Sequence, residues 1–462
     1  MPKRLVRTGG RLALIVALVL VALVVVAAAT LLAVPQWGAS LLPSATITRT
    51  AAPPAGWHAP ETASPPTLPL NDLDATAAPS AKALAARVAR LAPAAAATPG
   101  LVVMDPATGR TLLDRADRPL LPASTMKLVT CVAALDALGN GRTFTTAVLG
   151  PRKGVIVLRG GGDPLLRDAR STGRASLQQL AATTAAALRK SGTTTVTLGY
   201  DDTLFTGPSW HRDWTDNYLY SVAPITALMV DSGFNPRTGK ASKRPSVTAA
   251  HRFAARLKGQ GITVGSTRAM TAPSGAVELA AVVSPPLETV IENTLTYSDN
   301  VAAETLARHV GLSTGRGGSF AGAEAGVRAT VKKLGLWAAG TVIDDNSGLS
   351  RDNRVTPHSL AGAMRLVLTQ PAFRTVLLGL PVAGVSGTLY DRYDERSERA
   401  GRGTVRAKTG SLRDVSALAG FLVTADGSPL VFAILANHVA RPFAVQDWVD
   451  RTTAGWASCG CR

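Results

Sequence analysis

Pro122-Ala-Ser-Thr-Met-Lys127 introduces an apolar segment with helical spacing, which we expect to form a helix from Thr125 to Leu138. Within it, Ser124-Thr-Met-Lys127 is the single Ser-x-x-Lys of the chain. A serine at a helix start lies beside unpaired backbone N–H groups and the positive end of the helix dipole. The lysine three residues later lies on the same helix face and can reach the hydroxyl. The pattern indicates a serine nucleophile with a lysine base, although an N-cap serine beside a solvated lysine has the same sequence.

A second motif, Ser298-Asp-Asn300, is the single Ser-x-Asn of the chain. It falls between two segments with helical spacing, Leu287–Tyr297 and Val301–Val310. A hydroxyl and a carboxamide at a junction between helices suit a proton relay and the binding of a substrate amide. Serine, aspartate and asparagine also favour helix caps, so an ordinary cap is the competing interpretation.

A third motif, Lys408-Thr-Gly410, is the single Lys-Thr-Gly of the chain and follows an expected strand, Gly403–Ala407. A strand edge here would present a cation and a hydroxyl, and the glycine would let a substrate backbone approach closely. A plain turn after a strand is the alternative. The order of the three motifs, and their contexts of helix start, interhelical loop and late strand, make the set far more specific than any one member.

These residues resemble the penicillin-binding protein and serine β-lactamase superfamily. They are most similar to its low-molecular-mass class C members, which are D-alanyl-D-alanine carboxypeptidases and endopeptidases. The long separation of Ser124 from Ser298 favours that class, because β-lactamases have a much shorter segment there. The likeness covers roughly residues 81–456. Further strings typical of the family are Gly161-Gly-Asp-Pro-Leu165, Pro224-Ile-Thr-Ala-Leu-Met-Val-Asp231, Asp345-Asn-Ser-Gly-Leu349 and Gly384-Val-Ser-Gly-Thr388.

The resemblance implies roles for the first two motifs. Ser124 would be the nucleophile that forms an acyl-enzyme, and Lys127 would take the Ser124 proton. Ser298 would pass a proton to the leaving D-alanine nitrogen, while Asn300 would hold the amide of a peptidoglycan stem peptide. The chemistry needs no cofactor, and the six histidines show no metal-ligand spacing, so we expect no metal.

The third motif would bind the other end of the substrate. By the same resemblance, Lys408 and Thr409 would bind the terminal carboxylate, or the equivalent carboxylate of a β-lactam antibiotic acting as an inhibitor, with Gly410 giving access. The backbone N–H groups of Ser124 and Ser411 would form the oxyanion hole, where they stabilise negative charge that develops in the transition state.

The fold that the resemblance implies is α+β with a transpeptidase/β-lactamase-like core. An antiparallel sheet flanked by helices would lie beside a helical lobe that carries the serines. Residues 81–139 and 287–462 would form this catalytic domain, and residues 140–286 a strand-rich insertion between the first two motifs. In the insertion we expect short strands and one helix, Ser176–Leu188. Late in the chain, Asp426-Gly427 between two apolar runs predicts a hairpin.

The N-terminus predicts export. Basic residues precede an uncharged apolar run, Leu12–Val34, which is long enough to span a bilayer as a helix. We therefore expect residues 1–34 to be a short cytoplasmic tail and a single transmembrane anchor, with the catalytic domain outside the cell membrane. Cleavage near Ala27-Ala-Ala29, giving a secreted protein, is the alternative. Residues 35–80, rich in Pro, Ala and Thr, have the composition of a linker.

The chain is strongly basic, with a formal net charge of +18. Such an excess favours anionic partners. Aromatic residues are only 5% and no basic run is interleaved with them, so we expect no nucleic acid partner. Of the three cysteines, Cys131 lies in an apolar helix and is expected in the core, while Cys459 and Cys461 could form a local disulfide or stay reduced.

Several functions share these motifs. Carboxypeptidase and endopeptidase use the same acylation chemistry and differ in the amine that leaves. A β-lactamase-like hydrolase needs a positioned water and base, for which no loop containing a glutamate can be assigned. A non-catalytic, basic cell-wall-binding or scaffold protein is the alternative from another class, and it would not depend on Ser124. With all three motifs intact, the sequence favours the D-Ala-D-Ala carboxypeptidase.

Overall fold

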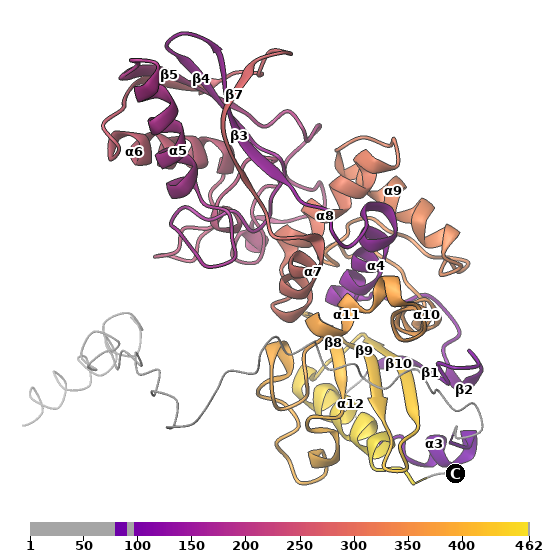
Figure 1. The fold of residues 1–462 in the computed structure, drawn as a ribbon. Helices are drawn as coiled ribbons and strands as arrows, with labels where there is room; N and C mark the ends of the chain where they lie inside the picture. Colours follow the sequence, from indigo (N-terminus) through magenta and orange to yellow (C-terminus); the bar gives the residue numbers. More distant parts are fainter. Residues whose placement is uncertain (1–78, 90–96, 461–462) are drawn as a thin grey trace, which may run out of the picture. The chain divides into compact units, whose positions relative to one another are not determined.

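The computed structural model describes residues 79–89 and 97–460 (Figure 1). The expected transmembrane anchor, and all but the last two residues of the expected linker, lie outside these residues. Within the described part of the chain, no helix combines the length and the apolar character needed to cross a membrane.

The first of two sheets has five antiparallel strands in the order β2-β1-β10-β9-β8. Its strands are β1 Thr98–Met104, β2 Thr111–Arg115, β8 Arg406–Leu412, β9 Val415–Val423 and β10 Pro429–Asn437. The β1 strand from the beginning of the described chain thus lies beside β10 from its end. The antiparallel core sheet expected from the family resemblance is confirmed.

The hairpin of β9 and β10 follows directly from the sequence. Gly427 adopts φ +83°, a left-handed conformation that glycine reaches without a steric penalty. Its N–H donates to the carbonyl of Thr424 (2.9 Å), which closes the turn. The pairing then continues from Pro429 opposite Val423 to Asn437 opposite Val415, so the turn sets the register of both strands.

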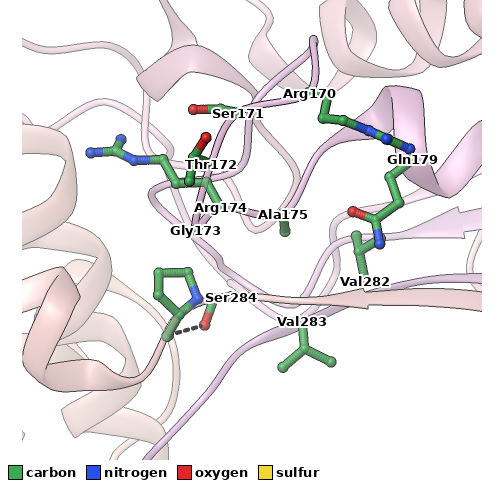
Figure 2. A pocket seen from close by; sticks show the side chains of 11 residues that line it. Arg170, Ser171, Thr172, Gly173, Arg174, Ala175, Gln179, Val282, Val283 and Ser284 are labelled. Carbon is green, nitrogen blue, oxygen red and sulfur yellow. Dashed lines mark hydrogen bonds between the residues drawn. The ribbon is translucent and has the colours of Figure 1, made fainter. Parts of the chain in front are cut away.

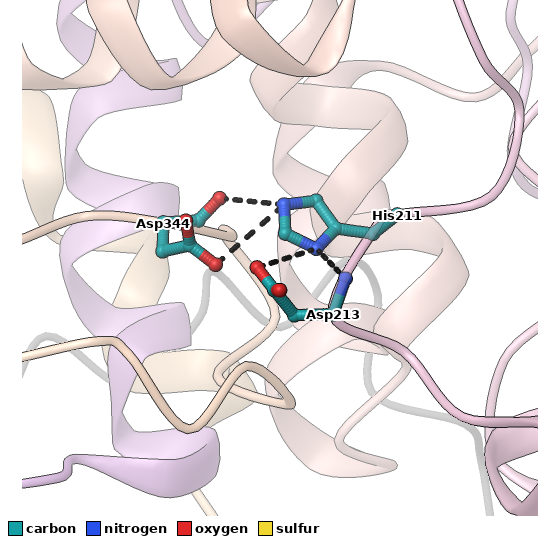
Figure 3. A group of neighbouring side chains, drawn as sticks. All are labelled: His211, Asp213 and Asp344. Atoms are coloured by element: carbon teal, nitrogen blue, oxygen red, sulfur yellow. Dashed lines mark hydrogen bonds and ion pairs between the residues drawn. The ribbon is translucent and has the colours of Figure 1, made fainter.

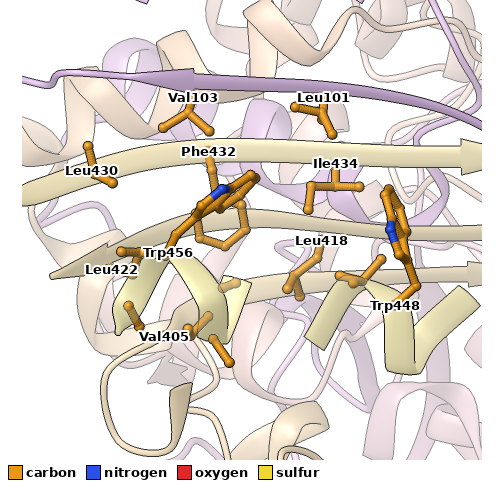
Figure 4. Packing of buried hydrophobic residues seen from close by; sticks show 14 of the residues in the cluster. Leu101, Val103, Val405, Leu418, Leu422, Leu430, Phe432, Ile434, Trp448 and Trp456 are labelled. Atoms are coloured by element: carbon orange, nitrogen blue, oxygen red, sulfur yellow. The ribbon is translucent and has the colours of Figure 1, made fainter. Parts of the chain in front are cut away.

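A hydrophobic core covers one face of this sheet (Figure 4). Trp448 and Trp456 of the last helix, α12 Pro442–Ala457, pack over Phe432 and its neighbours. The Trp456 Nε1–H donates to the carbonyl of Leu84 (3.1 Å), which fixes the short helix α3, Ala81–Ala86, to α12.

Helices cover the other face and form a lobe beside it. Helix α10 contacts β1, β9 and β10, and α4 is buried from Met126 to Leu135 among its neighbours. The helices of this part are α4 Met126–Leu138, α7 Leu287–Thr296, α8 Asn300–Ser313, α9 Phe320–Lys333, α10 Pro357–Thr369 and α11 Thr375–Gly379. The expected helices on both sides of Ser298 correspond to α7 and α8.

A second sheet lies entirely between the first two motifs, with the order β6-β5-β4-β3-β7. Its strands are β3 Thr145–Arg152, β4 Val155–Arg159, β5 Thr195–Asp201, β6 Thr263–Ala269 and β7 Val277–Val283. Strands β4, β5 and β6 run parallel, whereas β3 is antiparallel to β4 and β7. Helices α5 Leu177–Lys190 and α6 Pro245–Lys258 pack on it around one shared core.

The expected helix Ser176–Leu188 corresponds to α5, but a second helix of this segment, α6, was not predicted. Helix α6 begins with a proline in its first turn, where the missing N–H costs nothing, and ends with Arg256 and Lys258 near the negative end of its dipole. These signals are visible in the sequence, and the buried face of the helix includes Phe253 and Leu257.

The cysteines behave differently from one another. Cys131 on α4 is a free, buried thiol, as expected for a core residue. Cys459 is disulfide-bonded, so it does not stay reduced. Cys461 lies outside the described residues.

Candidate active site

The turn that carries Ser124 is strained and tightly enclosed. Ser124 lies in a short 3-10 turn, Ala123–Thr125, that leads into α4, and Ala123 has φ +46°, which is unfavourable for a residue with a side chain. A Cβ on Gly348 would lie 1.9 Å from the Ala123 carbonyl oxygen. A Cβ on Gly410 would lie 2.7 Å from the carbonyl oxygen of Pro122. Both glycines therefore let backbone from distant parts of the chain hold the nucleophile's turn.

This packing gives Gly410 a different role from the expected one. We expected it to admit a substrate backbone, but it admits the turn of the first motif. The strand also differs from the expectation: β8 begins at Arg406 and contains Lys408–Gly410, instead of ending before them. β8 is an edge strand of the sheet, and it contacts the turn Ala123–Thr125 that carries Ser124.

The second motif is held in a strained conformation at the junction of α7 and α8. Ser298 has φ +56°. Asp299 is the N-cap of α8, and its carboxylate accepts a hydrogen bond from the N–H of Ala302 (2.9 Å). Asp299 thus fixes the loop, and strain of this kind persists only where the surroundings enforce it.

Lys127 joins the first two motifs and is completely buried. Its Nζ lies 2.9 Å from the Ser124 Oγ, 2.6 Å from the Asn300 Oδ1 and 2.7 Å from the Ser347 carbonyl oxygen. Three donors therefore meet three acceptors, which is the full capacity of an ammonium group. The structure places the serine and lysine of the first motif in direct contact, with the asparagine of the second on the same nitrogen.

Burial increases the fraction of Lys127 that is present as the free amine. It lowers the pKa of Lys127 from 10.5 to about 8, because water no longer stabilises the ammonium form. The charges of Asp345, Glu304 and Asp299 oppose this effect in that order. A few per cent or more of the side chain is therefore unprotonated near neutral pH, as a general base requires.

Lys408 is buried and interacts electrostatically with Lys127. Its side chain is fully buried, and its Nζ donates to the Thr409 carbonyl oxygen (2.8 Å). Burial, and then the charge of Lys127, lowers the pKa of Lys408 well below its usual value. The Thr409 hydroxyl instead faces outward and shares a hydrogen bond with the hydroxyl of Thr388 (2.7 Å).

Residues of all three motifs line a small pocket of about 280 Å³. Its lining residues are Ser124, Ser298, Thr388, Arg392, Thr409, Ser411 and Gln446. The predicted nucleophile, relay serine, carboxylate-binding threonine and oxyanion-hole residue therefore share one cavity. Lys127, Asn300, Lys408 and Gly410 do not line it.

Three lining residues were not among the predicted site residues. Thr388 ends the string Gly384-Val-Ser-Gly-Thr388, which is typical of the family, so the sequence held a signal for it. Arg392 is held by Asp450 through its Nε (2.9 Å to Oδ2), and Gln446 comes from α12. Neither belongs to a recognisable motif, and only the folded chain brings them to the pocket.

A larger cavity, of about 650 Å³, lies between residues 170–175 and the end of β7 (Figure 2). Arg174 donates from Nη2 to the Asn293 Oδ1 (2.8 Å). In Figure 2 the side chains of Arg170 and Arg174 point away from each other. Their charges do not converge on one ligand position, and none of the predicted site residues lines this cavity.

Within the described residues, one group of side chains has the ligand types of a metal site: His211, Asp213 and Asp344 (Figure 3). The spacing of the histidines in the sequence does not indicate it. The Nε2 of His211 lies 2.9 Å from the carbonyl oxygen of Asp344, and the Asp344 carboxylate accepts hydrogen bonds from Arg212 and Ser350. These contacts engage the Nε2 and the carboxylate, so we assign the group to holding the loop that begins at Asp344.

Comparison with known proteins places the chain in a family. The sequence pattern of the D-Ala-D-Ala carboxypeptidase 3 (S13) family matches residues 80–240 and 235–455. A carboxypeptidase of Mycobacterium tuberculosis is 35% identical over 84% of this chain and 86% of its own length. The carboxypeptidase DacB of Mycolicibacterium smegmatis is 36% identical over 89% of this chain and 91% of its own.

The fold has a solved counterpart. The crystal structure of penicillin-binding protein 4 from Haemophilus influenzae superimposes with a TM-score of 0.69, over 81% of this chain and 98% of that one, at 22% identity. The same protein has also been solved in complex with a β-lactam. With the family pattern matching nearly all of the described chain, and two relatives above 30% identity over most of their length, this protein belongs to the D-Ala-D-Ala carboxypeptidase 3 (S13) family.

Proposed function

We propose that the protein is a serine-type D-Ala-D-Ala carboxypeptidase that removes the terminal D-alanine from peptidoglycan stem peptides through an acyl-enzyme on Ser124. The observation that carries the proposal is the contact between the Lys127 Nζ and the Ser124 Oγ (2.9 Å), in a buried site of a chain that belongs to this family. A nucleophile paired with a base of lowered pKa is the arrangement that covalent catalysis needs.

The first step is acylation. Unprotonated Lys127 keeps two N–H donors for Asn300 and Ser347 and has one lone pair, which faces the Ser124 hydroxyl. Lys127 would take the hydroxyl proton while the Ser124 oxygen attacks the carbonyl carbon of the D-Ala-D-Ala bond. The backbone N–H groups of Ser124 and Ser411 would stabilise the oxyanion.

The second half of the reaction releases both products. Ser298, which lines the pocket, would relay the proton to the leaving D-alanine nitrogen as the peptide C–N bond breaks. Water then hydrolyses the ester, with Lys127 again as base, and restores the Ser124 hydroxyl. The same acylation by a β-lactam leaves an adduct that deacylates slowly, so we expect inhibition.

The substrate carboxylate would lie at the Thr409 hydroxyl, which lines the pocket, with the buried Lys408 next to it on the same strand. Asn300 presents a complication, since its Nδ2 already donates to the Ser221 carbonyl (2.9 Å). We propose that a bound stem-peptide amide replaces that carbonyl as the acceptor. The hydrogen bond with Lys127 would remain.

The place of action is also part of the proposal. The apolar run Leu12–Val34 would anchor the enzyme in the cell membrane, with residues 140–286 as an inserted domain of the exported part. The charge of +18 would favour contact with anionic wall polymers. Endopeptidase activity would use the same site with a different leaving amine.

Intact-mass measurement tests the function. The full-length protein in detergent is incubated with a penicillin, alongside Ser124→Ala. We expect one covalent adduct, lost in the variant, followed by release of D-alanine from a stem-peptide substrate by the wild type alone. Absence of any adduct in folded protein would contradict the peptidase function and leave the non-catalytic wall-binding alternative. Rapid loss of the adduct with turnover of the penicillin would favour the β-lactamase-like one.

A further inference from the structure

A completely buried carboxyl group lies behind Lys127 that none of the steps above uses. Glu304, on α8, is inaccessible to solvent. Its Oε1 accepts hydrogen bonds from the backbone N–H groups of Asn346 (2.9 Å) and Ser347 (2.7 Å). Its Oε2 is buried and has no hydrogen-bond partner among the described residues. The residue whose N–H it holds, Ser347, offers its carbonyl to Lys127.

A second buried carboxyl group binds the same turn. Asp345 is also inaccessible to solvent. The five groups that donate to it are the Trp214 Nε1–H (2.9 Å), the Ser347 hydroxyl (3.2 Å), the Gly348 N–H (2.8 Å), the Ser350 N–H (2.6 Å) and the Asn353 Nδ2–H (2.7 Å). Glu304 thus binds the N–H groups of Asn346 and Ser347, and Asp345 binds those of Gly348 and Ser350 in the same short loop.

Two carboxyl groups this close and this buried do not both keep a negative charge, because neither water nor a direct ion pair compensates it. Asp345 accepts from five donors, and an ionised carboxylate is the form that only accepts. Glu304 has an unpaired oxygen, which is where a proton resides in the acid form. The hydrogen bonds thus distinguish the two members and assign the proton to Glu304.

We propose that Glu304 and Asp345 form a buried carboxyl pair that holds one proton, on Glu304, and that Glu304 is a positioning residue for Lys127. In its neutral form Glu304 fixes the turn that presents the Ser347 carbonyl to the Lys127 Nζ, without adding a second negative charge next to the base. The inference deepens the proposed function, since Lys127 is the base of the acylation step.

The charged groups around the pair agree with this assignment. Glu304 is faced by Asp345 from the loop and by Lys127 from α4, and it also acts on Arg308 one turn along α8. Lys127 is faced by Asp299, Cys131 and Lys408 as well. Burial first, and then the charge of Asp345, raises the pKa of Glu304 from 4.5 to about 8.

The pair has a consequence for the pH dependence of acylation. Because the pKa of Glu304 is raised, the group is neutral below about pH 8 and becomes charged above it. Its negative charge then favours the ammonium form of Lys127, in the same range where Lys127 would otherwise lose its proton. Ionisation of Glu304 should therefore lower the fraction of Lys127 in the free-amine form, and only above about pH 8.

Infrared spectroscopy of the full-length protein tests the proton directly, without any reaction. We expect absorption from protonated carboxyl groups near neutral pH, and the component that disappears near pH 8 should be missing from Glu304→Gln. Asp163 and Glu398 also have a pKa raised to about 7. Glu398→Gln is therefore the matched control, which should keep the Glu304 signal. An unchanged spectrum in Glu304→Gln would overturn the assignment.

The rate of acylation by a penicillin tests the positioning role. Glutamine keeps the Oε1 acceptor and the neutral charge, so Glu304→Gln should acylate within about twofold of the wild type below about pH 7. Above about pH 9 it should be at least threefold faster, since Lys127 is no longer held as the ammonium. A tenfold change near pH 6.5 would show that wild-type Glu304 is ionised there, and identical profiles would reduce it to a packing residue.

These two measurements separate the inference from the proposed function. The infrared signal is recorded on unacylated protein and can be repeated on Ser124→Ala. If the signal is present and no penicillin adduct forms, the peptidase function fails and the carboxyl pair stands. If the adduct forms and the signal is missing, the function stands and the pair is wrong.

Discussion

The two five-stranded sheets of this protein differ in how their faces are covered. In the first sheet, β9 and β10 are buried along nearly their whole length, with α12 on one face and α10 on the other. In the second sheet, helices α5 and α6 pack together over one face, and the edge strands β6 and β7 are largely exposed. The first sheet therefore leaves little room around Ser124, whereas the edges of the second should tolerate change.

Two glycines give the strongest contrast between these regions. Gly348 and Gly275 both have positive φ, +86° and +78°. A Cβ on Gly348 would lie 1.9 Å from the Ala123 carbonyl oxygen, but one on Gly275 would meet nothing within 4 Å. We expect Gly348→Ala to lower the free energy of unfolding by more than about 3 kcal/mol and acylation by at least a hundredfold, because the Ser124 turn must move.

The matched control is Gly275→Ala, near the start of β7, which changes only the backbone preference. It should cost about 1–2 kcal/mol, the usual penalty for a side chain in a left-handed conformation, and leave acylation intact. Urea denaturation measures the loss of stability in both variants, and penicillin acylation measures the effect on the Ser124 turn. Equal losses in the two variants would mean that the contact with Ala123 is not what makes Gly348 necessary.

Side-chain truncation compares the two sheets directly. Phe432 in β10 is fully buried between the tryptophans of α12 and the sheet, while Val277 at the start of β7 is 65% exposed. Phe432→Ala should cost about 3–5 kcal/mol, since it removes transfer energy and leaves a cavity. Val277→Ala should change the free energy of unfolding by no more than about 0.5 kcal/mol. A loss above about 2 kcal/mol in Val277→Ala would show that the edge of the second sheet is as tightly packed as the first.

The same contrast explains how much the sequence could predict. Strands β9 and β10 form long apolar runs around Asp426-Gly427, and the helices flanking Ser298 have clear apolar spacing, so local signals sufficed. The Ser-x-x-Lys contact follows from helix geometry alone, because three residues bring Lys127 back over Ser124. In the second sheet the edge strands β6 and β7 are largely exposed, and helix α6 was missed.

Other features depend on contacts between distant residues and have no local signal. Lys408 was expected at a strand edge facing the substrate, but its side chain is fully buried and does not line the pocket. The chain also contains Lys190-Ser-Gly192, which ends helix α5, so this type of pattern alone does not identify a catalytic strand. Glu304 is part of no motif, and its importance appears only when Asn346 and Ser347 lie against it.

The two regions meet at the loop that holds Lys127. From residues 211–221, which precede α6, Trp214 donates to Asp345 and His211 contacts the backbone of Asp344. The hydroxyl of Tyr218 donates to the carbonyl of Leu349 (3.2 Å). Residues of the segment between the first two motifs thus support the loop of residues 344–350. At these contacts, changes in that segment should affect the site as well as stability.

Trp214→Phe tests whether that support matters. The change keeps a buried aromatic ring but removes part of the indole and with it the Nε1–H donated to Asp345, which retains four other donors. We expect a loss of about 2–4 kcal/mol in stability, from a hydrogen bond to a charged group and the space left by the smaller ring, and about tenfold slower acylation as the Ser347 carbonyl shifts from Lys127. Trp210→Phe is the control, because its Nε1–H donates to the Trp214 carbonyl and not to the catalytic loop. It should cost about 0.5–1.5 kcal/mol and leave acylation unchanged. If both variants acylate at the wild-type rate, the segment contributes stability alone, and the catalytic loop is positioned entirely by the motif-bearing part of the chain.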